Sequence, residues 1–198
     1  MYIGTQIEAP EGLGSLVQSQ RYYYTSRSLS NGVLLVSFHS GPTTRWRVRT
    51  IHLDVELFES EMTSSPPGLR VCPVQAQLPQ ALEELEGMII ATDDDPKVMK
   101  GIEFRYQAIE FLLEAEEQIL ASAKPLKKIA ALGKAQGSKV HPHDLQYWFF
   151  TFILHGREKG ALRPATHLNG TWSRLDSPSV SKKLGRPSAQ GRRKGWSA

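Results

Sequence analysis

A cluster of cationic side chains stands near the end of this 198-residue sequence. In KKLGRPSAQGRRKGW, residues 182–196, six of the fifteen residues are Lys or Arg and none is acidic. Cations at this density neutralise phosphates, which is how proteins hold nucleic acids. Gly185 and Pro187 favour an extended backbone around Arg186, and such a strip can enter the minor groove of a duplex. The cations expected to contact phosphates are Lys182, Lys183, Arg186, Arg192, Arg193 and Lys194.

The two ends of the chain differ in charge balance. Residues 156–198 contain ten Lys or Arg and two acids, whereas residues 1–155 contain fourteen Lys or Arg and eighteen acids. A basic end on a mildly acidic body predicts a polyanionic partner for the C-terminal part. A solvated end without a partner explains the same asymmetry, and composition alone leaves both interpretations open.

Few other residues have types and spacings that could support chemistry. His141 and His143 stand beside Asp144, but polar residues at a helix start need no metal to explain them. Cys72 is the only cysteine, so neither an intrachain disulfide nor a cysteine-based zinc site can form within the chain. The sequence has no phosphate-binding Gly loop and no Gly-x-Ser-x-Gly elbow. We therefore expect no cofactor, no metal and no catalytic activity.

The first half of the chain has the pattern of a small antiparallel sheet. Three segments rich in aromatic and β-branched residues are separated by the turn formers SNG and SGPTT. Asp54 can cap a short helix that covers this sheet, and LRVCPV has the pattern of another strand. LPQALEELEGMII then starts as an amphipathic helix. The predicted elements are strands at 22–26, 33–38 and 45–51 and a helix at 54–62, within a β-rich domain assigned to residues 1–92.

The second half has helical periodicity. From Ile102 to Ala121, apolar residues recur at three- and four-residue steps. Pro125 fits the first turn of a second helix, for which Gly137 offers a left-handed stop, and a third helix begins near Pro142 and closes at Gly156. The predicted fold class is therefore α+β, with a linker at 93–101, a three-helix domain at 102–170 and a basic tail at 171–198.

Three helices with a tight Gly-containing turn between the second and third are typical of a helix-turn-helix. The periodicity equally suits a generic three-helix bundle. The basic, Gly- and Pro-punctuated extension that follows the third helix favours the DNA-binding interpretation. The residues predicted to be buried on the third helix, at positions i, i+3, i+4 and i+7, are Leu145, Trp148, Phe149 and Phe152.

The opposite, polar side of the third helix would then enter the major groove. Gln146 can pair with adenine and Thr151 can contact a thymine methyl group. A merely solvated helix face explains the same residues. The candidate DNA contacts in this region are Lys139, His143, Gln146, Tyr147 and Thr151.

The run LQYWFFTFILHGREKGALRPATHLNGTWSRL, together with KKLGRPSAQGRRKGW, resembles the N-terminal, end-binding region of TnsB/TniA-type transposases. These are the DDE-recombinase subunits of heteromeric transposons. In that family a helix-turn-helix with a Trp in its last helix is followed by Gly, an Ala-Leu-x-Pro step and a basic Gly-Arg-Pro linker. The resemblance implies binding to repeats at transposon ends and, as further partners, other transposition subunits. The matching positions are Trp148, Gly156, Ala161, Leu162, Pro164, Gly170, Lys182, Lys183, Gly185, Arg186, Pro187 and Gly191.

Two features depart from the family. The third helix contains no Lys or Arg, where the family tends to carry Arg beside the Trp, so phosphate contacts should shift to the tail. The sequence ends at Ala198, where the family's linker leads to further DNA-binding modules and an RNase H-like core. No catalytic Asp-Asp-Glu set can be assigned, so we expect a DNA-binding protein that is not an enzyme, either a fragment or the product of a truncated reading frame.

The sequence thus predicts sequence-specific binding of double-stranded DNA at transposon ends by a cytoplasmic protein. No run of 18 apolar residues and no signal peptide pattern is present, so no membrane association is expected. Two alternatives stay open. One is a protein-interaction module that docks a partner through an exposed patch of Phe150 and Ile153. The other is a stand-alone transcriptional regulator with the β-unit as a sensor.

Overall fold

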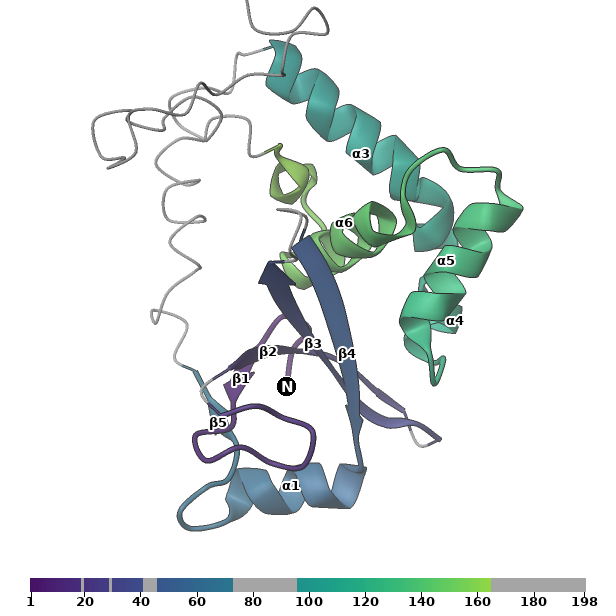
Figure 1. Cartoon of the computed structure of the whole chain (residues 1–198). Helices are drawn as coiled ribbons and strands as arrows, with labels where there is room; N and C mark the ends of the chain where they lie inside the picture. The colour runs from purple at the N-terminus through teal and green to yellow at the C-terminus, as the bar shows by residue number, and fades with distance from the viewer. Residues whose placement is uncertain (19, 29, 41–45, 73–95, 165–198) are drawn as a thin grey trace, which may run out of the picture. The chain divides into compact units, whose positions relative to one another are not determined.

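A five-stranded antiparallel sheet forms the N-terminal part of the computed structural model, which describes residues 1–18, 20–28, 30–40, 46–72 and 96–164. The strand order is β4-β3-β2-β1-β5, so β4 is an outer strand beside β3 (Figure 1). The central hairpins join segments rich in Tyr, Val and Leu, which fit a pleated surface. The strands are β1 Gln6–Glu8, β2 Arg21–Ser28, β3 Gly32–Ser40, β4 Trp46–Leu53 and β5 Arg70–Val71.

The sheet buries side chains on both faces, because successive side chains of a strand point to opposite sides. On one face, Leu34 and Val36 pack in the same cluster as the C-terminal helices. On the other face, Val33 and Leu35 pack with Phe58 of α1, Val55–Thr63. Asp54 caps α1 by accepting hydrogen bonds from the backbone N–H groups of residues 56 and 57, as the sequence predicts.

Within the described residues, four α-helices and one 3-10 helix follow (Figure 1). Helix α6 crosses the sheet face beside β4 and is also contacted by α3, α5 and η1. Gly137 has a φ of 67° and ends α5 in the left-handed conformation that the sequence analysis expected. These elements are α3 Pro96–Glu114, α4 Glu116–Leu120, α5 Pro125–Ala135, α6 Pro142–Leu154 and η1 Lys159–Leu162.

The predicted α+β class is confirmed, as are the three main strands, the capped helix and the starts of α5 and α6. Two details differ. The single helix expected over 102–121 is interrupted at Ala115, which separates α3 from α4. Residues 96–101, assigned to a linker, are the first turns of α3. The helix predicted in LPQALEELEGMII lies outside the described residues.

The sheet and the C-terminal helices share one hydrophobic core. Tyr23, Val36 and Val48 of the sheet pack with Ile109 of α3 and Phe149 of α6. Residues Met1–Pro164 accordingly form one compact unit. The division into one domain at residues 1–92 and another at residues 102–170 stays a prediction. None of the described helices has the length and apolar content needed to cross a bilayer.

Candidate nucleic-acid interface

Helix α6, the expected DNA-reading helix, lies in the interior. The side chains of Gln146 and Thr151 are only 7% and 9% exposed. The Gln146 Nε2 amide donates a hydrogen bond to the Leu126 carbonyl at 2.9 Å, and its Oε1 lies 3.2 Å from His143 Nδ1. The first contact ties α6 to α5 and the second lies within α6, so the Gln146 amide is used inside the protein. In this structure neither Gln146 nor Thr151 can reach a base edge, because the sheet and α5 cover them.

The Tyr147 side chain has a packing role at the sheet. Its ring meets Phe38 edge to face, with ring centroids 5.6 Å apart, and is stacked against Trp46. Burial raises the pKa of the Tyr147 phenol above its ordinary value. Of the five candidates in this region, Lys139 is fully exposed and His143 is half-buried at the start of α6. The six tail cations, Lys182 to Lys194, lie outside the described residues.

Trp148, which the resemblance matches to the family's helix Trp, packs between α3 residues. The Arg105 guanidinium lies 5.1 Å from the centre of the indole, and Phe104 meets the ring edge to face. Arg105 also donates to the carbonyls of Leu162 and Arg163, both at 3.1 Å. Burial lowers the pKa of the Arg105 guanidinium. This pair therefore fixes the course of the chain as it approaches Pro164.

The apolar surface on which the protein-interaction alternative depended is not exposed. Phe150 and Ile153 are 0% and 3% exposed and belong to the shared core. That form of the alternative is wrong, because these residues face the sheet and neighbouring helices and not solvent.

A basic surface that the sequence analysis did not single out lies on α5 and its flanks. No acid occurs between Glu117 and Asp144, whereas five lysines do. The buried positions of α5 are Pro125, Ile129 and Gly133. Helical geometry places Lys127 and Lys134 on the opposite, exposed side, while Lys128 lies half-buried at its edge. We call this the α5 lysine surface; it consists of Lys124, Lys127, Lys128, Lys134 and Lys139.

These lysines differ from several other cations of the protein. Arg27 pairs with Glu59 at 2.6 Å, Arg157 with Glu116 at 2.6 Å and Lys159 with Glu103 at 3.1 Å. No ion pair within 4 Å joins a lysine of the α5 lysine surface to an acid in the described part of the chain. Their charge is therefore left for solvent ions or for a partner.

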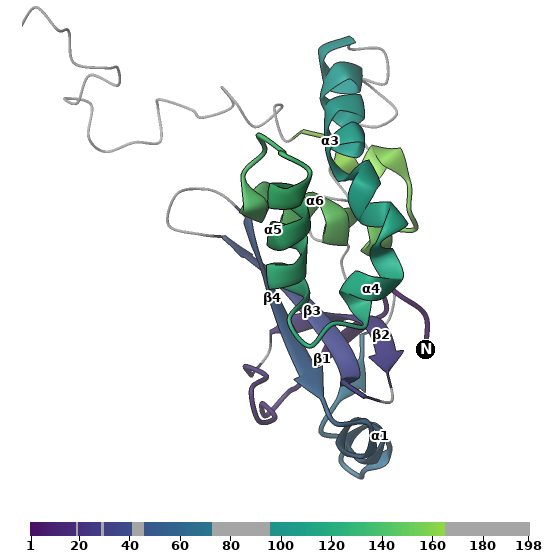
Figure 2. The same cartoon turned by 90° about the vertical axis from the view of Figure 1, so that its right-hand side faces the viewer.

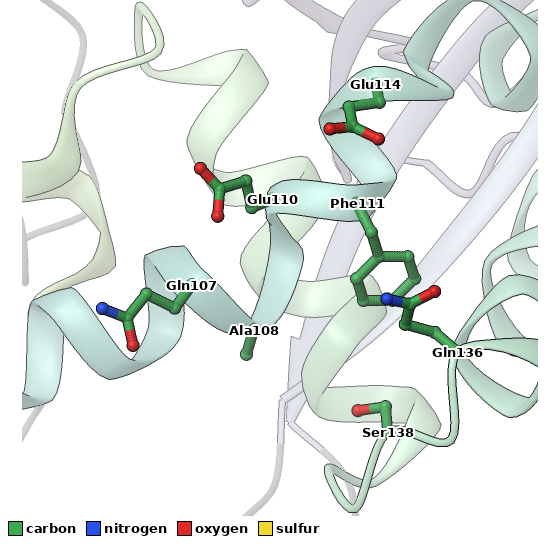
Figure 3. A pocket seen from close by; sticks show the side chains of 7 residues that line it. All are labelled: Gln107, Ala108, Glu110, Phe111, Glu114, Gln136 and Ser138. Atoms are coloured by element: carbon green, nitrogen blue, oxygen red, sulfur yellow. The ribbon is translucent and has the colours of Figure 1, made fainter.

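An acidic pocket borders this basic region. It lies between α3 and the turn after α5, has a volume of about 360 Å³, and is open to solvent (Figure 3). Glu110 and Glu114 supply carboxylates from α3, while Gln136 and Ser138 come from the turn. Across the ranges that the structure describes, no three metal-ligating side chains come together. The two carboxylates would repel phosphates, so a polyanion on α5 would lie away from α3.

Comparison with protein-family models finds no match for this chain, and comparison with curated proteins finds no significant relative. The function therefore has to be inferred from the residues of this chain. One signal in the sequence pointed to the α5 lysine surface: the stretch from 118 to 143, which contains five lysines and no acid.

Proposed function

We propose that this protein binds double-stranded DNA through phosphate contacts, with the α5 lysine surface as the main contact of the described body. The observation that carries the proposal is the group of five lysines on and beside one helix without an acidic partner among the described residues. Repulsion among like charges crowded on one surface is relieved when they contact DNA phosphates. The counterions that the DNA then releases favour binding. The basic segment at 182–194 is the second expected contact.

The resemblance to TnsB/TniA-type transposases is the reason for proposing transposon ends as the DNA target. With Gln146 and Thr151 in the interior, affinity would come mainly from phosphate contacts. Sequence preference would then depend on groove shape, which an extended strip around Arg186 can sense. The proposal therefore keeps DNA as the partner and replaces α6 with α5 as the contacting helix.

Fluorescence anisotropy of a labelled duplex across a salt series tests the proposal. Changing Lys124, Lys127, Lys128 and Lys134 together to Gln should make the slope of log K against log salt shallower by about 3.6. A control variant, Arg70→Gln with Lys100→Gln, removes two exposed cations elsewhere and should leave the slope nearly unchanged. Failure of the unmodified protein to bind at low salt, or an equal change per removed charge in both variants, would contradict the proposal.

A second candidate function, protein interaction, is favoured by two exposed apolar side chains. Met99 and Phe104 of α3 are 51% and 57% exposed. A five-residue step turns the helix by about 140°, so each side chain offers a separate contact to a partner. Gel filtration with and without duplex DNA separates the two functions, because self-association without DNA that Phe104→Ser abolishes would support the second.

A further inference from the structure

An exposed tryptophan stands at the start of the outer strand β4. Trp46 is the first residue of β4, is paired with Ser40 of β3, and leaves 47% of its surface exposed. Its indole ring lies nearly parallel to the Tyr147 ring, with an interplanar angle of 12° and ring centroids 6.2 Å apart. This is an offset stack, which covers one side of the indole. The exposed area therefore includes the side that faces away from Tyr147.

The Tyr147 ring is itself held in place from the core. Phe38 meets Tyr147 edge to face at 5.6 Å and an interplanar angle of 85°, and Tyr23 meets Phe38 at 5.6 Å and 64°. Tyr23 belongs to the shared core and is 8% exposed. A row of four rings thus runs from the core to the surface. Because its inner members are packed, Trp46 is presented in a fixed orientation, which lowers the cost of binding a flat ligand.

The surroundings favour a flat group that belongs to a polyanion. Helix α5 contacts both β4 and α6, the two elements that carry Trp46 and Tyr147 (Figure 2). A nucleobase next to phosphates on the α5 lysine surface has both the planar face and the charge that this arrangement fits. Bases inside a duplex are already stacked on their neighbours, so unpaired bases, and the outer face of a terminal base pair, are the faces that a tryptophan can meet.

We infer that Trp46 stacks on an unpaired nucleobase at a duplex end or single-strand junction while the α5 lysine surface holds the adjoining phosphates. This inference rests on the proposed function, since it places the base next to DNA already bound by α5. It adds a preference for ends with unpaired bases, which the lysines alone would not supply.

The test uses two DNA ligands that differ only in their bases. Each is the same duplex with a short single-stranded overhang, made of thymidines in one and of abasic sites in the other, so that the phosphates match. The full chain should bind the thymidine overhang roughly tenfold more tightly than the abasic one, within the range found for a stacked base. Trp46→Ala should abolish this difference. Tyr2→Ala, which removes an exposed ring near the N-terminus, should keep it.

A spectroscopic readout on the unsubstituted chain keeps the test independent of folding of the variant. The chain contains four tryptophans, and 5-fluorotryptophan labelling gives each a ¹⁹F resonance, with that of Trp46 assigned by Trp46→Phe. The Trp46 resonance should shift with the thymidine overhang and stay in place with the abasic overhang. Equal affinity for the two overhangs with binding to blunt duplex intact would overturn this inference alone. No binding to any of the ligands would defeat the proposed function and this inference together.

Discussion

Helices α5 and α6 are neighbours in sequence and in space, yet they have opposite relations to solvent. Helix α5 buries Pro125, Ile129 and Gly133 and carries lysines on its other side. Helix α6 buries eight of its thirteen residues and contains no Lys or Arg. The difference follows from their neighbours, because α6 is enclosed by the sheet, α3, α5 and η1. The exposure of each helix is thus decided by the elements that cover it, and not by its order in the chain.

The largest expected effect of this difference is on stability. Phe149→Ala removes a fully buried ring from the core shared by sheet and helices, and should lower the free energy of unfolding by about 3–5 kcal/mol. Urea denaturation followed by circular dichroism measures the change. Tyr2→Ala, at a position 88% exposed, is the control that also removes an aromatic ring, and it should cost less than about 1 kcal/mol. Similar losses in the two variants would mean that α6 is not the centre of the core.

A smaller effect separates a structural role of Gln146 from base reading. Gln146→Leu removes the amide that donates to the Leu126 carbonyl and contacts His143, and should lower the free energy of unfolding by about 1–3 kcal/mol. The ratio of affinities for different DNA sequences should not change. Gln107→Leu removes an exposed amide that donates to Glu103 at 3.3 Å and should stay within about 0.5 kcal/mol of the unmodified protein. A loss of DNA sequence preference with full stability would restore Gln146 as a base reader.

The smallest expected effect concerns alkaline pH. Burial raises the pKa of Tyr147 above the ordinary value of 10.0, so the neutral phenol stabilises the fold below pH 10. That contribution is lost as the pH rises through the raised folded-state pKa, by at most about 1.4 kcal/mol per pH unit. Tyr147→Phe should make the alkaline fall in unfolding free energy shallower, and Tyr2→Phe, at a position 88% exposed, should not. The urea midpoint as a function of pH measures both; identical profiles for the two variants would contradict a buried Tyr147.

Much of the fold could be predicted from the sequence because several local patterns are each typical of one kind of element. The alternation of residues in β2 to β4, the Asp54 cap and Pro125 at the start of α5 each determine local structure through neighbours in the chain. The interruption at Ala115 carries no such local signal. Residues in 73–95 and 165–198 lie outside the described part, so the predictions there stay predictions.

The contact surface could not be predicted in the same way, because exposure depends on distant segments. Periodicity predicts one buried face of α6 and leaves the other side for DNA. Three of the four residues predicted on that face are buried and Trp148 is half-buried; the four are Leu145, Trp148, Phe149 and Phe152. The run WFFTFIL is apolar all round, which is typical of a helix enclosed on every side, and this was the signal against an exposed reading helix. The placement of Gln146 toward α5 required the tertiary structure.

The central claim is that the α5 lysine surface, and not the polar side of α6, contacts DNA. Lysine acetylation footprinting with mass spectrometry tests it most directly, because it reports each lysine in the intact chain with and without duplex DNA. The account predicts protection of Lys124, Lys127, Lys128 and Lys134 on binding, with Lys100 and Lys159 labelled equally in both states. Equal labelling of the α5 lysines in both states, with protection confined to lysines elsewhere in the body, would contradict the claim.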